Sequence, residues 1–260
     1  MTYPDTYNGL HMHLDERVRA SADVAVPLLQ KLLPLQSVVD VGCGSGIWLD
    51  AFQRAGVGDY LGLDGDYIVR ATLQIPLERF QAADFTKSFS PGRNFDLAIC
   101  LEVAEHIPPN VADAFIESLS RAAPVVFFSA AIPGQGGMGH VNEQWPSYWK
   151  GKFETQGYVA FDTLRRWLWP RDDVFYWYAQ NSLLYVRESE IGRYPLLNNE
   201  PRDFIVDVLH PHRYLTLDRT ARAGESPSLA FLMKSAPSAA ARFVKSRLGI
   251  PLNLREPSHK

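Results

Sequence analysis

The sequence of 260 residues predicts an α/β protein built around a doubly wound, mostly parallel sheet. Short, continuously apolar runs alternate with segments of helical periodicity, which is the pattern of parallel strands joined by crossover helices. The first apolar run ends in a turn that contains Gly42, Gly44 and Gly46. A late aromatic segment, residues 175–188, has the composition of a strand that adds antiparallel to such a sheet.

The first part of the chain contains the elements of the parallel sheet. The predicted strands are residues 37–41, 60–64, 79–85, 95–101 and 125–131. Apolar residues at helical spacing predict a helix over 46–56, which Gly56 would end. A second helix is predicted over 111–123, and Asn110 is expected to cap it.

The pattern changes after the fifth strand. Residues 131–149 are first glycine-rich and then aromatic. Residues 148–158 predict a helix that Gly157 closes, and residues 175–188 predict the late strand.

Polar residues and glycines gather at the predicted carboxyl ends of the strands. In a doubly wound sheet these ends form one edge, and ligands bind there. The sequence therefore predicts a single cleft that brings together residues far apart in the chain. They are Gly42, Asp64, Asp84, Glu102 and Ala131.

The composition fits one sizeable domain with an appendage, which we place at residues 1–190 and 191–260. The first segment contains 15 Lys and Arg against 23 Asp and Glu, a net charge of −8. The second contains 11 against 6, a net charge of +5. An acidic body argues against RNA, which usually requires a basic groove.

The expected location is the cytoplasm. Cys43 and Cys100 each fall at the end of a predicted core strand, which argues against a disulfide and for a reducing compartment. The N-terminus has no apolar signal core, and no window reaches the roughly 18 apolar residues of a membrane span.

The glycine turn is suited to a nucleotide-like cofactor, because its backbone can approach a ligand closely. Its G-x-G-x-G spacing departs from the G-x-G-x-x-G of dinucleotide sites, where the third glycine would replace Ile47.

The segment "VVDVGCGSG" resembles the first motif of class I S-adenosylmethionine-dependent methyltransferases. "LGLD", "AADF" and "FDLAICLEVAEHI" resemble the next three, in the same order, over about residues 37–131. The resemblance implies a Rossmann-like, seven-stranded sheet with one antiparallel strand.

The resemblance also implies roles for cofactor-binding residues. Asp40 would organise the turn and help to hold the methionine ammonium group, while Gly42 and Gly44 lie against the methionine part. Asp64 would bind the ribose hydroxyls. At the other end of the cofactor, Asp84 would accept a hydrogen bond from the adenine amine and Phe85 would lie beside the ring. Leu101 would offer its backbone carbonyl to the ammonium group.

A metal site is predicted from Glu102, Glu105 and His106, whose i, i+3, i+4 spacing places them on one face of a helical turn. His140 would be the fourth ligand, or a general base. The set resembles the metal site of small-RNA 2′-O-methyltransferases, and E-x-x-E-H also occurs in ubiquinone-pathway O-methyltransferases. Mg²⁺ or Mn²⁺ is the expected ion. In many metal-free methyltransferases an E-H pair at this position only shapes the cofactor loop. The expected catalytic residues are His140, Glu102 and His106.

The expected acceptor is a hydroxyl of a sugar or glycoside. The segment 132–182 is rich in Trp and Tyr, with Asn142, Gln144, Gln180 and Asn181 among them, and aromatic faces plus amides suit a polyhydroxylated ring. It is similar to methyltransferases encoded with bacterial polysaccharide pathways. RNA 2′-O-methylation, methylation of a small aromatic acceptor, and a non-catalytic cofactor-binding scaffold remain as alternatives.

The end of the chain is basic. After Met233 there is one acid, Glu256, against six basic residues, which are Lys234, Arg242, Lys245, Arg247, Arg255 and Lys260. Phe243 and Ile250 fall near helical spacing with Arg247, so a short amphipathic helix could contact a membrane surface or a partner enzyme. The alternative is a solvated end.

Overall fold

A computed structural model of the chain describes residues 7–225. The contacts divide the chain into two units, residues 1–210 and residues 211–260, and the described part of the second unit is helix α8 (Pro211–Glu225). The boundary expected after residue 190 stays a prediction. The basic residues that follow Met233 lie outside the described residues.

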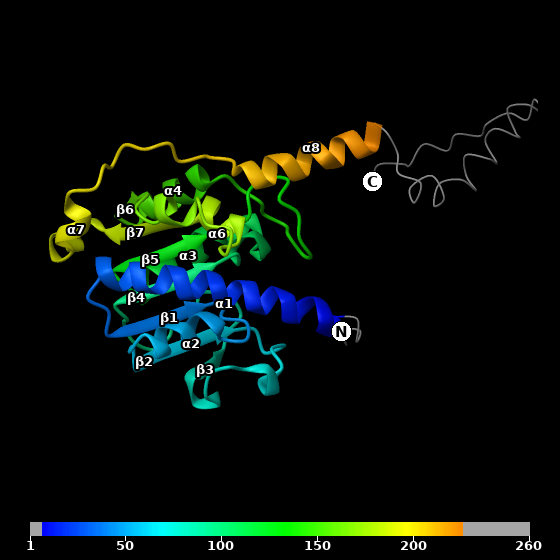
Figure 1. The fold of residues 1–260 in the computed structure, drawn as a ribbon. Helices are drawn as coiled ribbons and strands as arrows, with labels where there is room; N and C mark the ends of the chain where they lie inside the picture. Colours follow the sequence, from blue (N-terminus) through cyan, green and yellow to red (C-terminus); the bar gives the residue numbers. More distant parts are fainter. Residues whose placement is uncertain (1–6, 226–260) are drawn as a thin grey trace, which may run out of the picture. The chain divides into compact units, whose positions relative to one another are not determined.

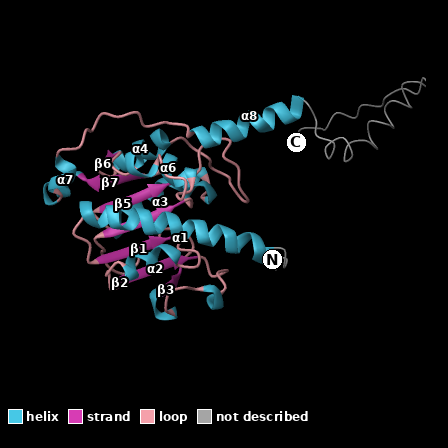
Figure 2. Cartoon of the chain, in the orientation of Figure 1, coloured by secondary structure: helices cyan, strands magenta, loops and turns pink. Residues whose placement is uncertain are grey.

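The first unit is organised around one sheet with strand order β3-β2-β1-β4-β5-β7-β6 (Figure 2). The strands are β1 (Ser37–Val41), β2 (Asp59–Asp64), β3 (Phe80–Ala82), β4 (Leu97–Leu101), β5 (Val125–Ser129), β6 (Tyr158–Phe161) and β7 (Leu183–Arg187). Strand β7 runs antiparallel to both β5 and β6, and the other neighbouring pairs are parallel. The predicted fold, a mostly parallel seven-stranded sheet with one antiparallel strand, is confirmed.

Helices cover both faces of this sheet. Successive strand residues point to opposite sides, and because most of the strand residues are apolar, both faces must be buried. On β1, Val38 belongs to one hydrophobic cluster, and Val39 and Val41 belong to the other. The first cluster includes α1 (Tyr7–Leu32), α2 (Ile47–Arg54), α5 (Arg165–Leu168), α6 (Tyr176–Asn181) and α7 (Pro195–Asn198), of which α1 and α2 lie in front of the sheet in Figure 1. The second cluster includes α3 (Ala112–Ala122) and α4 (Pro146–Thr155).

Short 3-10 helices make up several of the connections. They are η1 (Arg70–Thr72), η2 (Leu77–Arg79), η3 (Ala104–His106), η4 (Pro109–Val111) and η5 (Glu188–Arg193). Cys43 and Cys100 are buried free thiols. Among the helices described, none is long and apolar enough to cross a membrane.

Three local predictions were wrong in part. Asn110 does not cap α3, because it lies inside η4 and Val111 occupies the cap position without a side-chain hydrogen bond. The strand expected over 79–85 ends at Ala82, and the chain then turns at Asp84. The strand expected over 175–188 begins only at Leu183.

The first half of that late segment is helix α6. Aromatic residues favour strands only weakly, and packing overrides that preference here. Tyr178 is 6% exposed and its ring meets the Trp48 ring edge-on, with 5.3 Å between the centroids. Helix α1 and strand β6 were not among the predicted elements. Pro27 lies inside α1, a position where sequence rules do not expect proline.

Candidate active site

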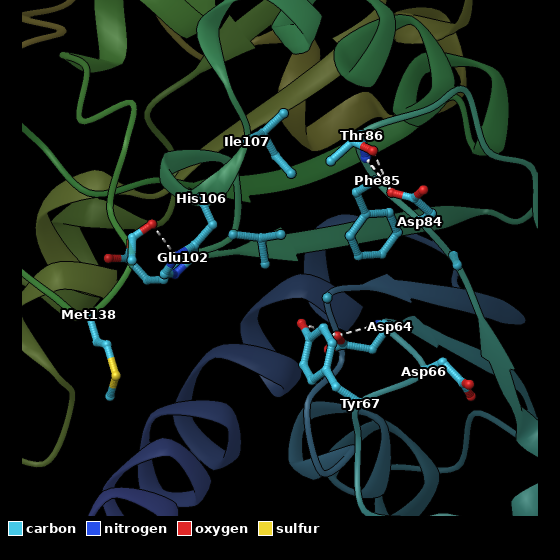
Figure 3. Close-up of a pocket in the computed structure, with 15 residues that line it drawn as sticks. Asp64, Asp66, Tyr67, Asp84, Phe85, Thr86, Glu102, His106, Ile107 and Met138 are labelled. Atoms are coloured by element: carbon cyan, nitrogen blue, oxygen red, sulfur yellow. Dashed lines mark hydrogen bonds between the residues drawn. The ribbon is translucent and has the colours of Figure 1, made fainter. Parts of the chain in front are cut away.

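A cavity of about 710 Å³ opens at the carboxyl ends of the parallel strands. The strand order reverses between β1 and β4, which is where such sheets bind ligands. Of the five residues expected in one cleft, Gly42, Asp64, Asp84 and Glu102 line this cavity. Ala131 does not, because it is fully buried in the core. In Figure 3, Asp64 and Tyr67 lie on one side of the cavity, and Glu102 and His106 lie on the other.

The glycine turn after β1 reaches the cavity at Gly42, the one residue of the turn in the described lining. Gly42 has a φ of 85°, and a Cβ at this position would lie 2.3 Å from Val103 Cγ2. Gly44 has a φ of 53°, and no described atom lies within 4 Å of the place where its Cβ would be. The turn therefore requires glycine at Gly42 for packing, and leaves open space above Gly44.

Asp64, at the end of β2, fixes this turn from the side. Its Oδ2 accepts a hydrogen bond from the Gly44 N–H at 2.7 Å. Its Oδ1 accepts hydrogen bonds from the Gly65 N–H at 2.6 Å and from the Tyr67 hydroxyl at 2.8 Å (Figure 3). Asp64 is only 5% exposed. Both oxygens of this buried carboxylate therefore accept hydrogen bonds within the protein, one of them from a hydroxyl group.

Asp40 lies in β1, close before the turn, and is 3% exposed. Its Oδ2 has no hydrogen-bond partner among the described residues. Burial, followed by the negative charge of Asp64, raises the pKa of Asp40 well above its ordinary value. A carboxyl group in this position is suited to a cationic ligand, which would supply the missing partner.

Asp84 and Phe85 line the cavity on the β3 side. Asp84 Oδ1 accepts hydrogen bonds from the backbone N–H of Thr86 at 3.0 Å and from its hydroxyl at 2.6 Å. Hydrogen bonds from Thr86 and Lys87 lower the pKa of Asp84 to about 2, so its carboxylate is an acceptor at neutral pH. The Phe85 ring packs edge-on against Phe89, with 5.1 Å between the centroids.

Glu102 follows Leu101 at the end of β4 and has a φ of 57°. It is the single non-glycine residue with positive φ in the described part of the chain, a conformation that costs about 1–2 kcal/mol. Its Oε2 accepts a hydrogen bond from Gln135 at 2.7 Å, and its Oε1 accepts one from Asn181 at 3.1 Å. Burial raises the pKa of Glu102, although these two hydrogen bonds act to lower it. Two amides from distant segments hold this side chain in the cavity wall.

Three of the four predicted metal ligands come together. Glu105, His106 and His140 each place one ligand atom within 4.8 Å of the others, and we call them the histidine cluster. Glu102 is not part of it, and this corrects the prediction of a shared helical face. The segment forms η3, which starts at Ala104, so Glu102 lies before the helix and turns toward the amides.

Glu105 is the buried member of the histidine cluster, at 1% exposure. Its Oε2 lacks a hydrogen-bond partner among the residues that the structure covers. Burial, and then the negative charge of Glu102, raise the pKa of Glu105 to about 9. His140 Nε2 lies 3.9 Å from Glu105 Oε1. Burial also lowers the pKa of His106, which favours a neutral ring able to act as a ligand.

The glycine-rich loop, residues 132–145, holds the histidine cluster through a residue that the sequence analysis missed. Glu143 Oε1 lies 2.8 Å from His140 Nδ1. The backbone N–H groups of Gly134 and Gly136 donate to the two oxygens of Glu143, both at 2.7 Å. Burial acts to raise the pKa of Glu143, but the hydrogen bonds from His140 and from these N–H groups lower it below its ordinary value. The H-x-x-E spacing was a signal that could have identified it.

The four amides expected to face an acceptor are largely engaged inside the protein. Gln180 donates to Asn181 Oδ1 at 2.8 Å and accepts from the His210 N–H at 2.8 Å. Gln144 donates to Asn142 Oδ1 at 3.1 Å. Half of the aromatic residues of this segment are buried in the core, and Trp145, at 39% exposure, and Trp167 are exposed.

Comparison with known proteins gives one family. A family model described as a methyltransferase domain matches residues 13–173. A ubiquinone biosynthesis O-methyltransferase of Methylococcus capsulatus is 32% identical over 103 residues, 36% of this chain and 43% of that protein. The chain therefore matches less than half of the length of this curated relative.

Solved structures show the same fold at low identity. The sugar N-methyltransferase KedS8 from Streptoalloteichus aligns with a TM-score of 0.55 and 16% identity, over 72% of this chain and 96% of that chain. Streptomyces venezuelae DesVI aligns with a TM-score of 0.53 and 14% identity, over 72% of this chain and 98% of that chain. At these identities the likeness concerns the fold alone.

Proposed function

Because this chain belongs to the methyltransferase domain family and is an S-adenosylmethionine-dependent methyltransferase, we propose that it methylates a hydroxyl of a neutral sugar or glycoside with the help of a divalent ion. The observation that carries the proposal is that the main cavity and the histidine cluster adjoin. His106 belongs to both, since it lines the cavity and lies within ligand distance of Glu105 and His140.

The cavity fits S-adenosylmethionine. When bound, this cofactor supplies an electrophilic methyl group on a sulfonium sulfur. Asp64 would bind the ribose hydroxyls, Asp84 the adenine amine, and the Leu101 carbonyl the ammonium group, with Phe85 beside the adenine. The open space at Gly44 and the buried, unpaired Oδ2 of Asp40 support this assignment, because they leave room for a bulky cofactor and an acceptor oxygen without a partner for its ammonium group.

The histidine cluster fits a divalent ion. It contains one carboxyl group with an unpaired oxygen, which would release its proton on binding the ion, and two imidazoles, a donor set that favours Mn²⁺ or Co²⁺ over Mg²⁺. Such an ion would lower the pKa of an acceptor hydroxyl. Glu105 would be the anionic ligand, and His106 and His140 would supply ring nitrogens. The proposal therefore uses three of the predicted ligands and leaves Glu102 out.

The reaction needs an acceptor oxygen to bond to the methyl carbon as the carbon–sulfur bond breaks, while the hydroxyl loses its proton. In the absence of an ion, His140 Nε2 would receive that proton. Glu102, held by Gln135 and Asn181 in the cavity wall, would accept a hydrogen bond from a neighbouring hydroxyl of the acceptor. These residues orient the acceptor and receive its proton.

Charge favours a neutral acceptor. The residues that line the cavity include Asp64, Asp66, Asp84 and Glu102, and the described lining contains no Lys or Arg. An RNA phosphate would meet repulsion there. The Trp145 ring, which is exposed on the glycine-rich loop, would supply an apolar face for a sugar, and KedS8, named a sugar N-methyltransferase, has the same fold. A small aromatic acceptor is the second candidate, because the 32% identical relative is an O-methyltransferase of ubiquinone biosynthesis.

The test is transfer of a labelled methyl group from S-adenosylmethionine to three acceptor panels: neutral saccharides and glycosides, catechol-type phenols, and short RNAs. We expect label on a saccharide oxygen, located by mass spectrometry and NMR. Label on phenols alone would select the second candidate. Label on RNA 3′ ends alone would refute the argument from charge.

A further inference from the structure

We propose that Glu143 is a positioning residue that holds His140 in the tautomer with the proton on Nδ1, so that the Nε2 lone pair faces the rest of the histidine cluster. The inference rests on the proposed function in one respect: the lone pair serves an ion or an acceptor proton. The placement of the proton follows from the hydrogen bonds of the loop alone.

The hydrogen-bond donors around Glu143 decide where the proton is. Gly134 N–H donates to Oε2 and Gly136 N–H donates to Oε1, each at 2.7 Å, and a backbone N–H can only donate. Both carboxylate oxygens therefore act as acceptors. The ring nitrogen 2.8 Å from Oε1 is His140 Nδ1, so this nitrogen is the donor and carries the proton. In a neutral imidazole the other nitrogen, Nε2, then has the lone pair.

That lone pair is directed into the histidine cluster. His140 Nε2 lies 3.9 Å from Glu105 Oε1. A Cβ on Gly137 would lie 2.1 Å from the same nitrogen, so the absence of a side chain at Gly137 gives the ring its place. Glu143 is 20% exposed and His140 is 12% exposed, which shields their hydrogen bond from water. The Glu143–His140 pair has the geometry of a carboxylate that orients an imidazole toward a metal or a proton.

His106 is held in the same tautomer by a different acceptor. Its Nδ1 lies 3.2 Å from the carbonyl oxygen of Gly139, and a carbonyl oxygen can only accept. The two rings are edge-to-face, with 4.9 Å between their centroids. The glycine-rich loop thus fixes the proton of both histidines on Nδ1, through a side chain for His140 and through its backbone for His106. This gives the experiment an internal reference.

The first test reads the proton directly, with neither metal nor substrate present. Long-range proton–nitrogen NMR of the ring nitrogens is recorded for the full chain at about pH 8, above the ordinary pKa of histidine. We expect the Nδ1–H pattern for His140 and His106 in the unmodified protein. In Glu143→Ala, His140 should change toward the Nε2–H form while His106 keeps its pattern. Glu143→Gln retains an acceptor oxygen and should keep the Nδ1–H form.

Three results would overturn the proposal. They are an Nε2–H pattern for His140 in the unmodified protein, an unchanged His140 pattern in Glu143→Ala, and the loss of both histidine patterns in Glu143→Ala. The last result would mean that Glu143 only shapes the loop.

The second test measures Co²⁺ affinity by visible absorption. Loss of an orienting partner typically weakens metal binding about 10- to 100-fold, which we expect for Glu143→Ala. The matched control is Glu154→Gln, whose carboxylate is exposed and pairs with Lys150 on α4, and it should bind Co²⁺ normally. If the unmodified protein binds no Co²⁺, the metal part of the proposed function fails, while the NMR result still decides the role of Glu143.

Discussion

The glycine turn after β1 makes a quantitative prediction, because two of its glycines face different surroundings. A methyl group on Gly42 would lie 2.3, 2.9 and 3.2 Å from Val103 Cγ2, Cγ1 and Cβ, and the first two distances are too short for a carbon–carbon contact. A methyl group on Gly44 would meet no described atom within 4 Å. Both glycines have left-handed backbones, with φ of 85° and 53°. Gly42→Ala should therefore mainly cost stability, and Gly44→Ala should mainly cost cofactor affinity.

The magnitudes follow from these contacts. The left-handed backbone costs alanine about 1–2 kcal/mol at either position. The collision with Val103 adds about 1–3 kcal/mol of overpacking to Gly42→Ala alone. Both replacements reduce the entropy of the unfolded chain to the same extent. The difference between the two losses of unfolding free energy therefore measures the collision with Val103. We expect Gly42→Ala to lose about 2–5 kcal/mol of unfolding free energy and Gly44→Ala about 1–2 kcal/mol.

The assay is urea unfolding of Gly42→Ala, Val103→Ala and the double variant, with Gly44→Ala as the matched comparison. Val103→Ala should relieve the collision, so the double variant should recover about 1–3 kcal/mol relative to the sum of the single variants. Calorimetry should show S-adenosylmethionine binding weakened in Gly44→Ala although this variant stays folded and loses only about 1–2 kcal/mol of unfolding free energy. Additive stabilities in the cycle, or equal losses for the two glycines, would refute this account of the turn.

Three further variants test the assignments in the site. Asp64→Ala should weaken S-adenosylmethionine binding about 10- to 100-fold, because hydrogen bonds to a charged group contribute about 1.5–3 kcal/mol. An unchanged affinity in calorimetry would remove the assignment of Asp64 to the cofactor. Folding raises the pKa of Asp40, so the protonated form of this side chain is favoured in the folded protein. The stability that the protonated form gives is lost as pH rises through the folded pKa. Asp40→Asn should therefore be more stable than the parent by about 1–3 kcal/mol above that pKa, with no gain at low pH, and a urea-unfolding gain equal at all pH values would contradict this sign. His140→Ala should keep its cofactor affinity while turnover falls about 10²- to 10⁴-fold, and unchanged turnover would make His140 a loop residue.

Much of the cavity could be predicted because its residues are fixed by the backbone. The carboxyl ends of parallel strands meet at one edge, so the positions of Gly42, Asp64, Asp84 and Glu102 in the chain were enough to place them together. The late antiparallel strand followed from the aromatic composition of residues 175–188 and from the family resemblance. These predictions needed the positions of the strands in the chain but no side-chain partners.

The remaining features depend on partners from distant segments. Glu102 turns away from the histidine cluster because Gln135 and Asn181 bind its carboxylate, and no local spacing reveals those hydrogen bonds. The i, i+3, i+4 rule assumed an α-helical turn where a 3-10 helix forms. Glu143 was missed because its function depends on two backbone N–H groups of the glycine-rich loop.

The most direct test of the central claim, a divalent ion at Glu105, His106 and His140 that assists methyl transfer to a sugar hydroxyl, is the effect of a chelator on that transfer. Labelled transfer to the best saccharide and S-adenosylmethionine affinity are measured in the same samples, before and after chelation and after addition of Mg²⁺, Mn²⁺ or Co²⁺. The account predicts that chelation abolishes transfer, leaves cofactor affinity unchanged, and is reversed by the added ion. Full transfer in the presence of the chelator would contradict it.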